Sequence, residues 1–352
     1  MRLIYINILC PTVAIDKGPG FDPTKWIRLF LYIVLCLLIL GLSSCEKFIE
    51  VGPPKDQTVS SNIYTNDATA ISVIKGIYSQ MINGSCFSGG SSSITYLVGL
   101  SSDELTDYSG AQQNEVFYKN SLDPTVVNSS LWSEPYQLIN NANALIEGLS
   151  NSHGVTPSIS TELVGEAKFV RAFCYFYLIN LFGDVPLVLS TDYTKNALAS
   201  RTSVDMVYKQ IIQDLKDAET KLATGFSASG GERIQPNKIA ATALLARATA
   251  VISDPSLALN TDLSKVFLAN SSETIWQLKP LGSNINTNEG FIFIPNSTPS
   301  YATISPNLLS TFEPDDLRRT NWVDSLTVGT DTYYYPFKYK VREGSTLTEY
   351  ST

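Results

Sequence analysis

Residues 166–187 read EAKFVRAFCYFYLINLFGDVPL and carry the clearest indication of the fold. Apolar side chains fall around most of the circumference of a helix here, and the pattern extends back to residue 163. A helix that is apolar on most sides is buried among other helices. Gly183, followed closely by Pro186, is a usual stop signal. The sequence therefore predicts a central buried helix over residues 163–182.

Four other segments repeat apolar residues at spacings of three and four, which is typical of amphipathic helices. They are residues 66–83, 130–149, 203–222 and 237–253. We expect Asn66 or Thr65 as the N-cap of the first helix and Thr202 as that of the third. The central helix and the two that follow it are predicted to begin at residues 163, 203 and 237, which lie 40 and 34 residues apart. This spacing predicts stacked helical hairpins of the tetratricopeptide type.

The pattern changes after residue 260. Short apolar or alternating runs predict β-strands at residues 273–279, 291–294 and 332–341. Pro336 lies on the polar face of the last run, which favours an edge strand. Residues 281–305 are rich in Asn, Ser, Thr, Gly and Pro, as loops that carry binding residues often are. We expect a mainly α-helical protein, with a loop-rich region and short β-strands toward the C-terminus.

The N-terminal segment has the features of an export signal. Residues 29–42 form an uncharged apolar run of 14 after Lys25 and Arg28, which suits a signal peptide better than a membrane span. Residues 42–45 read LSSC and begin with the last Leu of this run. They resemble a bacterial lipobox, so Cys45 is the expected lipidation site. The alternative is an ordinary signal anchor with a buried cysteine. Residues 1–24 form an unusually long segment before the basic residues and apolar run of the signal peptide, so we expect the true start codon to lie after Met1.

A polar segment follows this signal. Residues 46–61 contain Gly52, Pro53 and Pro54, which indicates an extended tether. The expected organisation therefore has four parts: a lipoprotein signal peptide at 1–44, a tether at 45–61, a helical scaffold at 62–260, and a loop and short-strand region at 261–352.

The composition is that of a globular protein, with 44% hydrophobic and 16% charged residues among 352. A net charge of −8 and the lack of any Lys/Arg run disfavour nucleic-acid binding. One His and five Cys are too few for the common zinc clusters and for most acid–base active sites. No spacing indicates a disulfide framework. We therefore expect no metal, no cofactor and a fold stabilised by packing.

Several short motifs occur in one order between residues 45 and 325. They are Cys45, Gly76-Ile77-Tyr78, Ser102-Asp103-Glu104, Trp132…Tyr136…Ala142-Asn143, 166–187, Arg201-Thr202…Val207-Tyr208…Ile211…Asp214-Leu215, 241–250 and Thr311-Phe312-Glu313. Together they resemble the SusD/RagB family of outer-membrane nutrient-binding lipoproteins. The segment FGDVPL at residues 182–187 is the most specific part of the resemblance.

The resemblance implies a lipid-anchored, surface-exposed outer-membrane protein that binds glycans, or other nutrients, in starch or polysaccharide utilisation. It implies a tetratricopeptide-like scaffold, and a SusC-like TonB-dependent transporter as the partner that receives the oligosaccharide. It also implies that the protein is not an enzyme. Family members continue past the equivalent of Tyr350 into further helices, so we expect the sequence to be C-terminally incomplete relative to the family.

Two other functions stay open. An anchored glycoside hydrolase needs two carboxyl groups that face each other across the sugar. Asp103 and Glu104 are adjacent and their side chains diverge, so structural or capping roles fit them better. The second alternative is a helical-repeat scaffold that binds only proteins.

Polar residues on the predicted helices have structural explanations. We expect Glu166 and Arg171 to form a buried ion pair or carbonyl contacts. Asn143 is expected to bond to the backbone of a neighbouring helix. His153 lies in a polar loop and is expected to be solvated.

Aromatic residues are the compositional feature that favours sugar binding, with Phe 15, Tyr 18 and Trp 4. Aromatic faces can stack on a pyranose ring while polar groups bind its hydroxyls. Rings in periodic apolar stripes are assigned to packing, namely Trp132, Phe173, Phe176 and Trp276. The candidate ligand-binding residues lie outside such stripes: Tyr108, Trp322 and Tyr334.

Overall fold

The computed structural model describes residues 63–83, 86–123, 130–246, 262–280 and 284–352, together with 24, 27–28 and 30–34. The chain divides into two compact units, residues 1–57 and 58–352, and the fold below is that of the second. The described residues of the first unit are helical. No helix in the described ranges is long and apolar enough to cross a membrane. The predicted lipidation site Cys45 and the tether lie outside these ranges.

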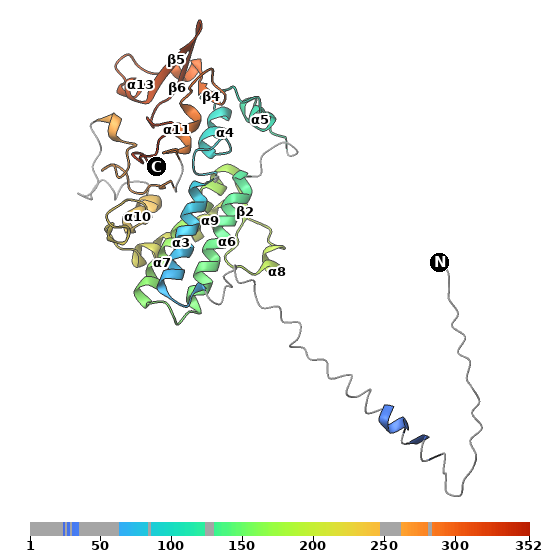
Figure 1. The fold of residues 1–352 in the computed structure, drawn as a ribbon. Coiled ribbons are helices and arrows are strands. Elements are labelled where there is room, and N and C mark those ends of the chain that lie inside the picture. Colours follow the sequence, from blue (N-terminus) through green and yellow to red (C-terminus); the bar gives the residue numbers. More distant parts are fainter. Residues whose placement is uncertain are drawn as a thin grey trace, which may run out of the picture. The chain divides into compact units, whose positions relative to one another are not determined.

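One half of the second unit, in space and not in sequence, is a bundle of helices (Figure 1). Its members are α3 (Asp67–Ile82), α6 (Ser130–Ser150), α7 (Pro157–Phe182), α9 (Val204–Lys221) and α10 (Lys238–Ala246). Helix α7 packs against α6 and α9, α3 covers α6 and α7, and α10 packs on α9. The predicted central helix and the stacked helical architecture are confirmed. Helix α7 begins earlier than predicted, with Pro157 in its first turn, where proline is favoured.

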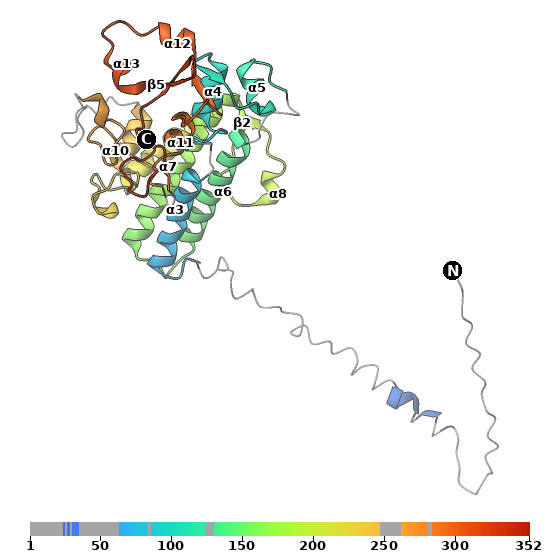
Figure 2. The same cartoon turned by 45° about the horizontal axis from the view of Figure 1, so that its top comes forward.

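The other half contains short helices and strands gathered over one end of this bundle (Figures 1 and 2). The helices are α4 (Ile94–Ser101), α5 (Gln112–Tyr118), α11 (Asn288–Phe293), α12 (Pro306–Ser310), α13 (Leu317–Trp322) and the single turn η4 (Leu263–Lys265). A second apolar core joins α4 to α11, where the Tyr96 and Phe293 rings stack with centroids 6.0 Å apart. This half therefore has its own buried support.

The strands form two-stranded antiparallel sheets within the described residues. Strand β1 (Leu105–Asp107) pairs with β4 (Ala302–Ile304), β2 (Val185–Pro186) with β3 (Arg201–Thr202), and β5 (Val323–Val328) with β6 (Asp331–Pro336). Between β2 and β3 lies the single helical turn α8 (Tyr193–Asn196), and η2 (Ser227–Ser229) precedes α10. The predicted strand 332–341 exists but ends at Pro336, because its partner there, Val323, is the first residue of β5 and directly follows helix α13.

Two of the predicted strands are wrong. Residues 291–294 belong largely to helix α11, because the Thr287 hydroxyl accepts a hydrogen bond from Gly290 N and starts a helix there. Residues 273–279 form no strand, only an isolated bridge between Leu278 and Ser351. Short apolar runs do not distinguish helix from strand by periodicity.

The start of α9 explains the most specific motif of the sequence. Thr202 is not the N-cap; Ser203 is, and its side chain makes no capping bond. The carboxylate of Asp184 instead accepts a hydrogen bond from Val204 N at 3.0 Å. Gly183 has φ +68°, a conformation that favours glycine and ends α7. The segment FGDVPL therefore ends one scaffold helix and caps the next.

Arg171 is at the centre of a buried polar network. Its Nε and Nη2 donate to the carboxylate of Asp214 at 2.8 and 2.7 Å, and its Nη1 donates to Asn143 Oδ1 at 2.8 Å. The predicted buried ion pair of Arg171 is confirmed. Asn143 donates to the carbonyls of Val188 and Ser190, which lie in the loop after β2 and not in a helix as expected. The network thus fixes that loop to the bundle.

Glu166 is not the partner of Arg171. Its side chain is 3% exposed and accepts a hydrogen bond from the hydroxyl of Tyr78 on α3. Burial raises the pKa of Glu166 from its ordinary 4.5 to about 8, against the opposing effects of Tyr78 and the charge of Lys75. Glu166 is therefore mainly neutral near pH 7.

Candidate functional site

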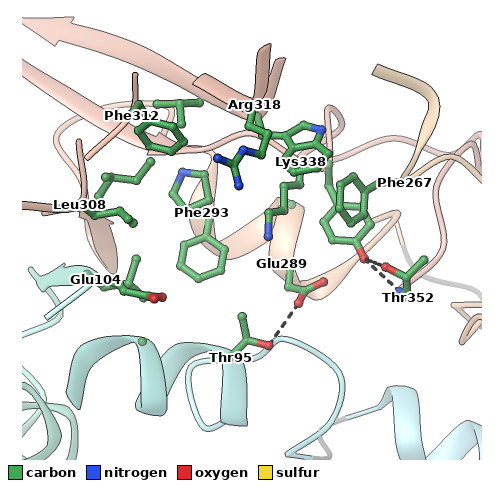
Figure 3. A pocket seen from close by; sticks show the side chains of 18 of the residues that line it. Thr95, Glu104, Phe267, Glu289, Phe293, Leu308, Phe312, Arg318, Lys338 and Thr352 are labelled. Atoms are coloured by element: carbon green, nitrogen blue, oxygen red, sulfur yellow. Dashed lines mark hydrogen bonds between the residues drawn. The ribbon is translucent and has the colours of Figure 1, made fainter. Parts of the chain in front are cut away.

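A cavity of about 620 Å³ opens among the short elements of the second half (Figure 3). Its walls come from α4, β1, α11, α12 and α13 and from the segment after β6. The rings and aliphatic side chains in the lining include Phe267, Phe293, Leu308, Phe312, Trp322 and Tyr339. The polar and charged side chains are Thr95, Glu104, Glu289, Thr311, Arg318, Lys338 and Thr352.

Three rings along one side of the cavity hold one another in place. The Phe267 ring meets Trp322 edge to face with centroids 5.5 Å apart, and Tyr339 with centroids 5.3 Å apart. Trp322 Nε1 donates to the carbonyl of Leu263 at 2.9 Å. An aromatic side chain whose polar atom is bonded and whose ring is packed presents a rigid surface to a ligand.

Glu289 is the unusual polar group of the cavity. One oxygen, Oε1, accepts a long 3.5 Å hydrogen bond from the Thr95 hydroxyl, while Oε2 is buried and has no partner among the described residues. The nearby Tyr339 hydroxyl is bonded to Thr352 at 3.0 Å (Figure 3). Burial raises the pKa of Glu289, and the Tyr339 hydroxyl and the charge of Lys338 oppose this effect. A buried acceptor without a donor is costly unless a ligand or water supplies one.

The position of Glu289 depends on Gly89, far away in the sequence. Gly89 has φ +76°, and a Cβ atom there would lie 2.1 Å from Cγ of Glu289. Only glycine leaves room for the carboxylate stem. The site is thus assembled from segments separated by about two hundred residues, as the Thr95–Glu289 contact also shows.

Of the three predicted ligand residues, only Trp322 lines this cavity. Tyr108 is exposed and meets Tyr333 edge to face at 5.8 Å. Tyr334 lies under the guanidinium of Arg319, whose Cζ is 5.1 Å from the ring centroid. The structure does not bring the three together, and their roles in binding stay predictions.

The other sequence assignments have clear positions. Trp132, Phe173, Phe176 and Trp276 pack against the helical core, as predicted. His153 is exposed in its loop. The side chain of Glu104 lines the cavity, whereas Asp103 contributes its carbonyl to the Ser305 hydroxyl. Glu289 was missed because it stands in a polar stretch predicted as loop and strand; the Thr287 cap two residues before it was the available signal.

A second hollow, of about 970 Å³, lies between α3 and α6. Its polar lining includes Gln80 and Asn141, but these amides already bond to each other at 2.8 Å. No group of three or more potential metal ligands occurs in the described part of the chain. The cavity with the unpartnered Glu289 oxygen is therefore the better candidate site.

Stacked helices that support a loop-built cavity, lined by fixed rings and polar groups, define the architecture of a helical-repeat protein with one candidate ligand site. Residues 47–249 match the SusD-like family model described as "Starch-binding associating with outer membrane". The chain belongs to the SusD-like family.

The relatives agree with this assignment. SusD-like protein P25 of Formosa agariphila is 25% identical over 200 residues, which cover 54% of this chain and 38% of that protein. A solved laminarin-binding SusD-like protein has a TM-score of 0.63 at 20% identity and covers 82% of this chain and 77% of its own. Surface glycan-binding protein A from Bacteroides thetaiotaomicron, solved with laminarihexaose, has a TM-score of 0.61 at 14% identity and covers 78% and 70%. The chain spans about two fifths of the curated relative, and the solved structures share its fold.

Proposed function

We propose that this protein binds glycans without cleaving them, and that the cavity between α11 and α13 is the binding site. The observation that carries the proposal is the buried, unpartnered Oε2 of Glu289 in the same cavity as the fixed ring of Trp322. A sugar hydroxyl supplies the missing donor, and the C–H face of a pyranose stacks on an aromatic ring. The laminarin-binding relatives and the starch-binding description of the family support this class of ligand.

The cellular setting is part of the proposal. We infer a signal peptide over residues 1–44, lipidation of Cys45, and a tether over 45–61 that holds the protein at the outer membrane. The family description, which includes outer-membrane association, supports this location. Delivery of the captured oligosaccharide to a SusC-like TonB-dependent transporter follows from the family resemblance.

Replacing Trp322 with alanine is expected to weaken oligosaccharide binding by about 1–3 kcal/mol, taking ring stacking on a sugar as comparable to stacking on a base. The Trp322 ring also packs on Phe267, so some stability is lost as well. Isothermal titration with neutral hexasaccharides, laminarihexaose and maltohexaose, measures the affinity, and thermal melting measures the stability. Recovery of the sugar unchanged distinguishes a receptor from the alternative glycoside hydrolase.

Trp276→Ala is the matched control. Trp276 is also half-buried, but it packs edge to face against Phe169 and Phe173 in the helical core, with centroids 5.3 and 5.6 Å away. This variant should melt earlier and bind normally. Equal loss of affinity in both variants, or none in Trp322→Ala, would refute the proposed site.

A further inference from the structure

Lys338 is a cation at the candidate site with no salt bridge in the part of the chain that the structure describes. Its side chain is exposed, and its Nζ lies 5.7 Å from the centroid of Phe267 and 5.8 Å from that of Trp322. Both distances are within the range of cation–π attraction. The two rings that form the proposed stacking surface therefore also hold a positive charge beside it.

Arg318 brings a second cation into the same cavity (Figure 3). Its Nε and Nη2 bond to the carboxylate of Asp316, the N-cap of α13, at 3.0 and 2.6 Å. Nη1 has no bond to the described residues. Asp316 therefore fixes the direction of the guanidinium and leaves one edge available to a ligand, a geometry that suits an oxyanion.

The charges in the cavity are divided between its walls. The cations come from α13 and the segment after β6, whereas the carboxylates of Glu104 and Glu289 come from the loop before β1 and from α11. Glu289 and Lys338 form no salt bridge in the described part of the chain, although the charge of Lys338 opposes the rise in the pKa of Glu289. The carboxylate wall can accept hydroxyl protons. The opposite wall offers Lys338, which forms no salt bridge with the described residues, and the free edge of Arg318, whose other edge is paired with Asp316.

We propose that the preferred ligand is an acidic glycan, carrying a uronate carboxylate or a sulfate ester, and that Lys338 and Arg318 bind its negative group. This inference rests on the proposed function, because it concerns the same cavity. A chain with a net charge of −8 repels acidic polymers overall. A local pair of cations at the stacking surface is what allows such a ligand to be captured.

The test is isothermal titration of the full chain with three hexasaccharides: neutral laminarihexaose, hexagalacturonate, and a sulfated carrageenan hexasaccharide. At least one acidic sugar should bind about tenfold or more tightly than the neutral one, as a charge-assisted hydrogen bond allows. Its affinity should fall between about 50 mM and about 300 mM salt, because the cations are exposed to solvent. The uronate and sulfate probes identify which anion is preferred.

Lys338→Met keeps the aliphatic stem and removes the charge. It should reduce acidic-sugar affinity about tenfold, a clearly larger loss than for laminarihexaose, which meets the same cavity wall but carries no charge, and Arg318→Met should act in the same direction. Lys216→Met, on the exposed face of α9, is the control for net charge and should have no effect. If only neutral sugars bind, or Lys338→Met leaves the acidic sugar unaffected, the acidic ligand is refuted while the glycan site stands. If no sugar binds, both proposals fail.

Discussion

Arg171→Met is expected to lower the free energy of unfolding by about 3–5 kcal/mol, because it leaves a buried carboxylate without its cation. Arg171 is 5% exposed and Asp214 1% exposed, and their two charge-assisted hydrogen bonds are 2.8 and 2.7 Å long. Asn143 also loses the donor to its Oδ1. Urea unfolding followed by far-ultraviolet circular dichroism measures the change.

Lys168→Met gives the matched comparison on the same helix. Lys168 pairs with Asp217 across the same α7–α9 contact, but the two side chains are 18% and 33% exposed. A partly solvated pair of this kind contributes about 1 kcal/mol or less. Similar losses in both variants would show that the Arg171 network does not hold the scaffold together.

Glu166→Gln is expected to make the protein more stable at alkaline pH and to remove part of its pH dependence. A carboxyl group whose pKa is raised to about 8 in the folded state binds its proton more tightly there than in the unfolded chain. Stability should therefore fall as the pH rises from about 4.5 to about 8 in the native protein. Between pH 4.5 and 8, at about 1.4 kcal/mol for each pH unit, the free energy of unfolding should fall by at most about 5 kcal/mol.

Glutamine resembles the neutral carboxyl group in shape and can still accept from the Tyr78 hydroxyl. Unfolding free energies of both proteins, measured from pH 4.5 to 9, should agree at the acidic end and separate at the alkaline end. Glu115→Gln, where the glutamate is half exposed beside Lys119, should follow the native curve. Parallel curves for Glu166→Gln and the native protein would show that Glu166 is ionised when folded.

The helices of the scaffold follow from local sequence. Residues 66–83 and 203–222 were predicted from apolar spacing, and α3 and α9 end within one residue of those limits. Apolar periodicity is a local signal, and the Asn66 cap reinforces it by accepting from Thr69 N at 3.0 Å. Long amphipathic helices are therefore predictable without knowledge of their neighbours.

The cavity could not be predicted in the same way. Trp322 was singled out because it stands outside any apolar stripe, but its rigid setting depends on Leu263 and Phe267, about sixty residues away. The burial of Glu289 depends on the missing side chain at Gly89. Such features arise from contacts between distant segments, which periodicity does not report.

The strongest sequence motif has a structural role. In FGDVPL, Asp184 caps α9, Val185 is fully buried and the Pro186 carbonyl accepts a hydrogen bond from Tyr136 at 2.7 Å. This explains how the motif can identify the scaffold without indicating the ligand. It also explains why the sequence indicates the family more specifically than the sugar.

A crystal structure of the protein with its tightest-binding hexasaccharide tests the central claim most directly. We predict a sugar ring against Trp322, with one hydroxyl within hydrogen-bond distance of Glu289 Oε2. The second hollow between α3 and α6, with its paired amides Gln80 and Asn141, should hold no sugar. Sugar density in that hollow, with the Trp322 cavity empty, would contradict the account.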